Sequence, residues 1–235
     1  GEDVSILSLL TVPDLPRAPG ARAVTAMEHS PDGRLLATAR HGGVEIREGD
    51  KTVRDLKIAT GKVNALHFSQ DGATLVTAAG LPGLNGVATL WDIGTGRPLR
   101  EIGAGYHRDA LYDAELSPDG KRLATGGYDA KIGIWDTATG ERLHGIEVHN
   151  GAIYDLAFSP DGRVLASASG DFTVKLWRVA DGTRLDTLNQ PEAEQFRVAF
   201  TPDSQHIVAA GADNRIRLWR FVSKTAPQLN PLLQT

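Results

Sequence analysis

The tetrapeptide Ser159-Pro160-Asp161-Gly162 is the clearest copy of a phrase that returns throughout the chain. Its proline presets φ at the second position of a type I turn, its aspartate suits the third, and its glycine takes the left-handed position that follows. The phrase therefore predicts the turn of a β-hairpin. The five copies begin at Ser30, Ser69, Ser117, Ser159 and Thr201, and the last copy reads Thr-Pro-Asp-Ser.

The phrases recur at a nearly constant spacing, with gaps of 39, 48, 42 and 42 residues between their first members. A tryptophan lies 18 residues after the third, fourth and fifth phrases, at Trp135, Trp177 and Trp219. Trp91 lies 22 residues after the second phrase, which fits a loop inserted at residues 80–86. In the first unit we assign the tryptophan place to Ile46. The chain is therefore an array of five repeats.

Short runs of alternating apolar residues flank every turn, a pattern typical of half-buried strands. Each unit reads as four short antiparallel strands. We expect the first strand of each unit near residues 22–28, 61–68, 110–116, 151–158 and 194–200. Residues 98–102 and 142–146 are candidates for fourth strands.

Over residues 22–222 the sequence resembles the WD40 repeat family. The five turn phrases carry this resemblance together with Trp91-Asp92, Trp135-Asp136 and the variants Trp177-Arg178 and Trp219-Arg220. It implies an all-β fold, a β-propeller of four-stranded antiparallel blades arranged radially about a channel, with five blades visible in this chain. Seven blades is the common number in the family, so five is either a complete ring or a fragment of a larger one.

A narrower resemblance is to the WD40 portion of large bacterial proteins that join a haem c domain to WD40 repeats. The runs at 107–113, 184–188 and 212–217 and the tail at 230–233 carry it. The chain has no cysteine, so it cannot attach haem c covalently, and we expect no cofactor. If the narrower resemblance holds, the protein is periplasmic or exported. Otherwise it is cytoplasmic.

Composition and charge narrow the partners. The formal net charge is −4 and no block of lysine and arginine stands out, so nucleic acid is not an expected partner. The longest apolar stretch near the start runs only from Ile6 to Val12, too short to insert into a membrane, and we see no signal peptide.

One propeller domain is expected over residues 1–222, followed by an extended tail or linker at 223–235. Pro227 and Pro231 disfavour a regular outer strand after Trp219, because proline cannot donate to a ladder. Residues 4–10 are a β-prone run with no blade of their own. We expect this run to pair with residues 215–220, complete the fifth blade and close the ring, since proteins avoid exposed strand edges.

The family resemblance also implies a buried His–Ser/Thr–Asp–Trp network in complete blades. It falls on His107, Thr125, Asp129 and Trp135 in the third unit, and on His149, Ser167, Asp171 and Trp177 in the fourth. A Ser-His-Asp set also invites a hydrolase interpretation. We favour a structural role, because the set recurs at the repeat spacing and no oxyanion-hole signature accompanies it. The remaining histidines lack zinc-type spacing, so we expect no metal site.

Aromatic residues mark a candidate partner-binding face. Tyr112, Tyr154 and Phe196 each lie five residues before a turn phrase, where the family's inner strands face the channel mouth. Tyr128 and Arg108 are the other two candidates for this face. Tyrosine and arginine are favoured interface anchors, although packing between blades is an equal alternative.

The residues that follow the aromatic ones are Asp113, Asp155 and Arg197. We expect opposite charges of neighbouring blades to pair there. The alternative is that the two carboxylates gather a cation.

The sequence therefore predicts a non-catalytic scaffold that binds a protein or peptide, or further domains of its own full-length chain. Two alternatives remain open. One is a propeller that binds a small ligand or acts as an enzyme at the channel mouth, and the other is a structural spacer within a larger exported haem c electron-transfer protein.

Overall fold

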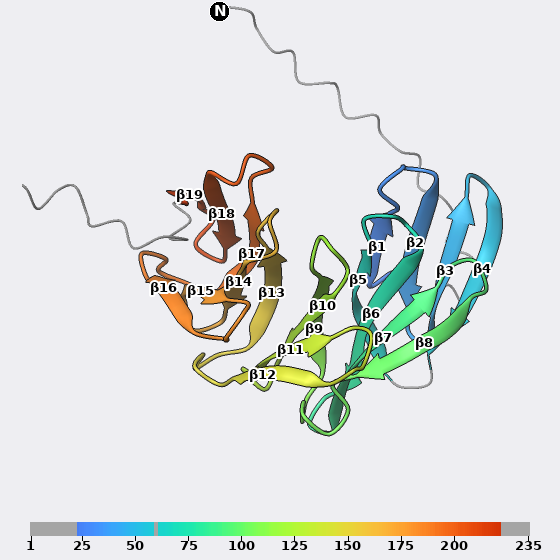
Figure 1. Cartoon of the computed structure of the whole chain (residues 1–235), viewed down its shortest axis with the longest axis horizontal. Coiled ribbons are helices and arrows are strands. Elements are labelled where there is room, and N and C mark those ends of the chain that lie inside the picture. Colours follow the sequence, from blue (N-terminus) through green and yellow to red (C-terminus); the bar gives the residue numbers. More distant parts are fainter. Residues whose placement is uncertain (1–22, 59–60, 222–235) are drawn as a thin grey trace, which may run out of the picture.

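The computed structural model describes residues 23–58 and 61–221, and every regular element in this part of the chain is a β-strand. Figure 1 shows five antiparallel sheets standing side by side around an arc. We number them blades 1 to 5 in chain order. Blades 1 to 4 have four strands each, and blade 5 has three among the described residues.

The strands follow one another within each blade in chain order. Blade 1 contains β1 (Ala26–His29), β2 (Leu35–Arg40), β3 (Gly43–Glu48) and β4 (Lys51–Lys57), and blade 2 contains β5 (Lys62–Phe68), β6 (Thr74–Leu81), β7 (Asn85–Asp92) and β8 (Arg97–Ile102). Blade 3 contains β9 (Leu111–Leu116), β10 (Arg122–Gly127), β11 (Ile132–Asp136) and β12 (Arg142–Ile146). Blade 4 contains β13 (Ile153–Phe158), β14 (Val164–Ser169), β15 (Val174–Arg178) and β16 (Arg184–Leu188), and blade 5 contains β17 (Gln195–Phe200), β18 (His206–Gly211) and β19 (Ile216–Arg220).

The first strand of each blade lies innermost. These inner strands, β1, β5, β9, β13 and β17, contact one another in turn along the arc (Figure 1). They coincide with the five expected inner strands, and β8 and β12 coincide with the expected fourth strands. The predicted fold class, an all-β array of antiparallel propeller blades, is confirmed.

The repeated phrase forms the predicted turn at the end of every inner strand. In blade 4 the amide of Gly162 donates to the carbonyl of Ser159 at 2.7 Å. The Ser159 hydroxyl donates to the Asp161 carboxylate at 2.6 Å and accepts from the amide of Val164 at 3.0 Å. The serine and the aspartate therefore lock the turn from inside, a role beyond the turn propensity of the individual residues.

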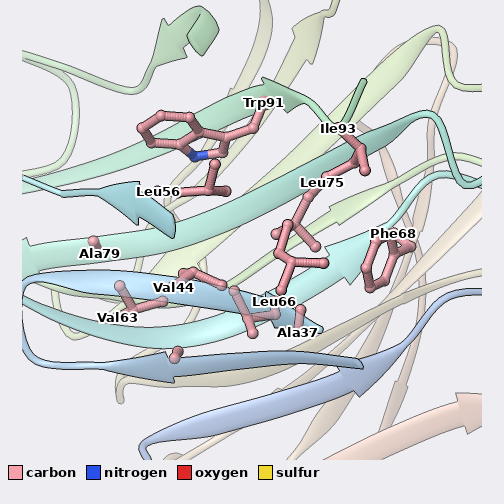
Figure 2. Close-up of a cluster of buried hydrophobic side chains, with 12 residues drawn as sticks. Ala37, Val44, Leu56, Val63, Leu66, Phe68, Leu75, Ala79, Trp91 and Ile93 are labelled. Carbon is pink, nitrogen blue, oxygen red and sulfur yellow. The ribbon is translucent and has the colours of Figure 1, made fainter. Parts of the chain in front are cut away.

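The hydrophobic core lies between blades, because each sheet buries its faces against its neighbours. Figure 2 shows the cluster between blades 1 and 2, where Trp91 and Leu75 from blade 2 meet Leu56 and Val44 from blade 1. Similar clusters fill the other three interfaces. A single blade cannot bury both of its faces alone, so the array is the folding unit.

The structure corrects the assignment of Ile46 to the tryptophan place. Leu123 pairs with Trp135 across the β10–β11 hairpin, and in blade 1 the equivalent Leu36 pairs with Arg47. The β2–β3 hairpin is one residue shorter, so the count from the turn phrase points to the wrong residue. Ile46 lies on the opposite face of β3 and is buried against blade 2.

Carboxylates join the inner strands of successive blades. The edge of each inner strand that faces the axis has no strand to pair with its N–H groups. Asp113 of blade 3 accepts from the amide of Leu156 in blade 4 at 2.8 Å. Asp155 of blade 4 accepts from the amide of Val198 in blade 5 at 2.7 Å. Each of these acids thus satisfies a buried donor of the next blade.

Cations balance this row of acids. Arg197 pairs with Asp155 at 2.6 Å, which confirms the expected pairing of opposite charges between neighbouring blades. His67 lies 2.9 Å from the other oxygen of Asp113. Burial acts to lower the pKa of His67, but the Asp113 carboxylate outweighs it and raises this pKa to about 10.

The two ends of the arc do not meet. Val174 and Leu176 of blade 4 are buried under blade 5, whereas their counterparts on blade 5, Ile216 and Leu218, are 79% and 61% exposed. Figure 1 shows the gap between β19 and blade 1. Residues 4–10 and the tail at 223–235 lie outside the described residues, so the closing strand stays a prediction.

We predict that replacing Glu115 with Gln removes a pH dependence of stability. Glu115 accepts from the amide of Phe158 at 2.9 Å, and burial raises its pKa to about 8. Between the ordinary carboxyl pKa and 8 the folded protein holds a proton that the unfolded chain has lost, so wild-type stability falls as pH rises through this window. Glutamine keeps the acceptor and carries no titrating proton.

The variant should therefore gain free energy of unfolding over wild type as pH rises, by at most about 1.4 kcal/mol per pH unit. Urea unfolding of both proteins across the window measures this difference. A difference that stays constant with pH contradicts the prediction.

We also expect deletion of residues 1–12 to leave blade 5 uncovered and to promote association or unfolding. Size-exclusion chromatography and thermal unfolding of the full and truncated chains test it. A truncated chain that is as stable and monomeric as its parent means that residues 4–10 do not close the ring.

Candidate partner-binding face

Four aromatic side chains form a continuous row at the start of the inner strands. The ring centroids of Tyr112 and Tyr154 lie 5.5 Å apart, and those of Tyr154 and Phe196 lie 5.3 Å apart. Tyr128, from the β10–β11 turn, meets Tyr112 edge-on at 6.3 Å. The structure therefore brings four of the five predicted face residues together, across blades 3, 4 and 5.

The row is partly open to solvent. Tyr128 is 60% exposed and Phe196 is 42% exposed, while Tyr112 and Tyr154 are half-buried between them. Burial raises the pKa of both Tyr112 and Tyr154, so their hydroxyl groups stay protonated at neutral pH. Packing between blades and exposure to a partner are thus properties of the same residues, and the two sequence-based interpretations do not exclude each other.

A groove of about 420 Å³ runs beside this row, between blades 2 and 3. Tyr112 and Tyr128 line one side, and Asn64 and Pro82 line the other. Pro82 belongs to the long β6–β7 hairpin, which occupies the inserted stretch 80–86. A Cβ atom on Gly80 would lie 2.8 Å from the Cα of Ala110, so a glycine there lets the hairpin pack against blade 3. The insertion thereby builds one wall of the groove.

Arg108, the fifth predicted face residue, lies apart from the row. Its backbone amide donates to Asp129 at 3.1 Å, and its side chain lines a different groove with Tyr106, Lys131 and Arg142.

Two exposed apolar residues near the face were not identified from the sequence. Leu84 and Phe172 lie in the hairpin turns between the second and third strands of blades 2 and 4, the same type of turn that carries Tyr128. Phe172 has φ of +68°, a left-handed conformation that a bulky residue rarely adopts. The Gly-Asp that precedes it was visible as a turn signal, but its exposure was not.

The predicted networks assemble around the tryptophans. In blade 4, Ser167 Oγ accepts from the Trp177 indole at 2.8 Å and lies 2.7 Å from His149 Nε2, and His149 Nδ1 lies 2.8 Å from Asp171. In blade 3, Thr125 Oγ1 accepts from Trp135 at 2.8 Å and lies 2.8 Å from His107, whose Nδ1 is 3.2 Å from Asp129.

The structure adds cations that the sequence did not reveal. Lys175 donates to Asp171 at 2.7 Å, and the equivalent Arg217 of blade 5 donates to Asp213 at 2.7 Å. Burial raises the pKa of Asp171, but hydrogen bonds from His149 and Lys175 outweigh it and hold that pKa far below its usual range. In blade 5, Trp219 has no Ser/Thr partner and donates to Gln190 at 2.6 Å.

These networks offer no reactive group to a substrate. Ser167 and Thr125 are fully buried, and each is already bonded to a histidine and a tryptophan. Within residues 23–58 and 61–221, no group of three His, Asp or Glu side chains is placed to hold a metal ion. No helix in the same residues is long and apolar enough to cross a membrane.

The largest groove, about 960 Å³, lies at the opposite end of the blades. It is lined by the turn phrases of blades 3 and 4, including Pro118, Asp119 and Asp161, together with Arg163 and Arg178. Asp119 and Asp161 are engaged by the serines of their own turns, so this groove presents few free polar groups.

We predict that replacing His149 with Ala lowers the free energy of unfolding by about 1–3 kcal/mol, since Ser167 and Asp171 lose a buried partner. Burial lowers the pKa of His149, so the folded protein resists the proton that the unfolded chain binds in acid. Wild-type stability therefore falls as pH drops below the ordinary histidine pKa, and the gap to the variant narrows. Urea unfolding at neutral and mildly acidic pH measures both effects. An unchanged melting temperature with loss of an activity contradicts the structural role.

Comparison with known proteins fits this architecture. A family model described as "WD domain, G-beta repeat" matches residues 50–92, 97–136, 140–178 and 182–220. Each match spans the outer strand of one blade and the first three strands of the next. A relative from Saccharomyces cerevisiae, "U3 small nucleolar RNA-associated protein 12", is 30% identical over 115 residues, which cover 48% of this chain and only 12% of that protein. The chain belongs to the WD40 repeat family.

Proposed function

We propose that this chain is a non-catalytic interaction module, and that the row of Tyr112, Tyr128, Tyr154 and Phe196 binds a protein or peptide partner. The observation that carries the proposal is the contact of these four rings across three blades, with Tyr128 and Phe196 open to solvent. WD40 domains commonly mediate protein interactions, which supports the proposal at the level of the family.

The chemistry of the row suits a peptide. Aromatic rings held by their neighbours give contact area with little loss of side-chain entropy, and tyrosine hydroxyls add hydrogen bonds. The adjoining groove has apolar walls from Tyr112 and Pro82 and polar groups from Lys62 and Asp109 at its rim. A peptide that lies across the rings can place one side chain in this groove.

The alternatives have less support. An enzyme or small-ligand binder at the channel mouth needs accessible acid, base or nucleophile groups, and the described inner strands begin with aromatic rings there. A spacer within a haem c protein rests on the narrower resemblance, which neither the family match nor the yeast relative supports.

The yeast relative bears on the partner only indirectly. Its printed name associates it with a small nucleolar RNA, and this chain spans 12% of its length. A net charge of −4 makes a direct role in binding a phosphate backbone unfavourable for this chain. A protein contact within a larger assembly agrees better with the aromatic row.

The test is a variant with both Tyr112→Ala and Tyr154→Ala. Peptides selected on the wild-type chain from a random display library should bind this variant at least about thirtyfold more weakly, because a hot-spot residue contributes about 2 kcal/mol or more. Isothermal titration calorimetry measures each affinity, and circular dichroism checks that the variant is folded.

A matched control replaces Leu99 and Leu143 with Ala. These residues are also exposed and apolar, but they lie on the outer strands β8 and β12. The control should keep wild-type affinity. Binding retained by the folded tyrosine variant would move the partner site to the sides of the blades or to the opposite face.

A further inference from the structure

A second groove, of about 530 Å³, lies on blade 3 away from the aromatic row. Its lining contains three cationic side chains, Arg108, Lys131 and Arg142, together with Tyr106 and one acid, Glu147. The cations come from three segments: the loop before β9, the turn before β11, and β12. The fold thus gathers separate positive charges around one ring.

Tyr106 is the fixed floor of this groove. Its hydroxyl donates to the carbonyl of Ile132 at 3.1 Å, and its ring packs edge-on against Trp135 with centroids 5.6 Å apart. A Cβ atom on Gly145 would lie 3.0 Å from the hydroxyl oxygen, so the glycine leaves room for the ring. Burial raises the pKa of Tyr106 to about 12, so the ring carries no negative charge of its own at neutral pH.

The ring orients the cations. The guanidinium carbon of Arg142 lies 4.2 Å from the Tyr106 centroid, and Lys131 Nζ lies 5.4 Å from it. Such cation–π contacts hold a charge in place without using its hydrogen-bond donors. Lys131 pairs with Glu147 at 2.7 Å, whereas neither Arg108 nor Arg142 forms a salt bridge within the described residues. Two guanidinium groups therefore face the groove with free donors.

Blade 4 shows that the fold does not require this arrangement. It repeats the same hairpins, yet Tyr106, Arg108, Lys131 and Gly145 are replaced there by Val148, Asn150, Thr173 and Thr187. Only the arginine paired with the tryptophan persists, as Arg142 opposite Trp135 and Arg184 opposite Trp177. Blade 3 thus carries a charged groove on a frame that is stable without one, which points to a ligand.

We propose that this groove binds an oxyanion, a carboxylate or phosphate, on a side chain of a peptide. Arginine donors match such groups bidentately. The favoured carrier is a peptide, because the positive charge is confined to one groove that also contains Glu147, whereas a nucleic-acid backbone needs a row of basic groups. The inference does not rest on the aromatic row, which shares no lining residue with this groove.

The experiment titrates the folded chain with a tetraglutamate peptide, a phosphoserine tetrapeptide and a neutral tetraserine peptide by calorimetry at low ionic strength. The two anionic peptides should bind and tetraserine should not. Arg108→Gln and Arg142→Gln should each weaken binding about tenfold, the loss of one charge-assisted donor group. Glu147→Gln should strengthen binding, because it frees Lys131. The tighter of the two anionic peptides identifies the preferred group.

Arg184→Gln is the matched control, since it removes an exposed arginine at the same strand position in a blade that lacks the groove. It should leave the affinity unchanged. The variant with Tyr112→Ala and Tyr154→Ala should also keep its affinity for tetraglutamate. The proposal is overturned if Arg184→Gln weakens binding as much as Arg142→Gln does, or if the anionic peptides bind no better than tetraserine. A decathymidylate oligonucleotide that binds more tightly through the same arginines overturns the assignment to a peptide.

Discussion

The inner edge of a propeller blade poses a hydrogen-bonding problem that shapes this protein. An inner strand pairs with its own blade on one side only, and its other N–H groups face the axis. Here the acids of one blade satisfy the donors of the next, from Asp113 to Leu156, from Glu115 to Phe158 and from Asp155 to Val198. Because the donor and its acceptor lie more than 40 residues apart, these bonds fix the blades relative to one another as well as satisfying the edge.

The aromatic row follows from this constraint. Tyr112 directly precedes Asp113, Tyr154 precedes Asp155 and Phe196 precedes Arg197. The acids set the height of each inner strand against the next, and the neighbouring side chains point to the other face of the strand. The rings of three blades therefore meet at one level. A binding surface built on strands pinned in this way is already organised before a partner arrives.

Blades 3 and 4 show how one frame carries different surfaces. Both have the His–Ser/Thr–Asp–Trp network, and both have a left-handed residue after the network aspartate, Ala130 and Phe172. Blade 4 adds the buried Lys175, whereas the equivalent Gly133 in blade 3 lies so close to the Trp135 indole that a Cβ atom would clash. The loops differ more, and one of them builds the cationic groove. The interior holds the frame while the loops vary the chemistry.

The sequence by itself determined the number of units, the position of nearly every strand and the members of the two complete networks. Turn geometry and alternating burial are local properties, so residues such as Ser159, Asp161 and Trp177 specify them at fixed spacing. Only the tertiary structure decided that Arg47 and not Ile46 holds the tryptophan place, that His67 and Glu115 join the charged row, and that Arg108 leaves the aromatic residues for a groove with Arg142. Those outcomes depend on contacts between blades and on the lengths of hairpins, and a chain of repeats brings such distant residues together only when it packs.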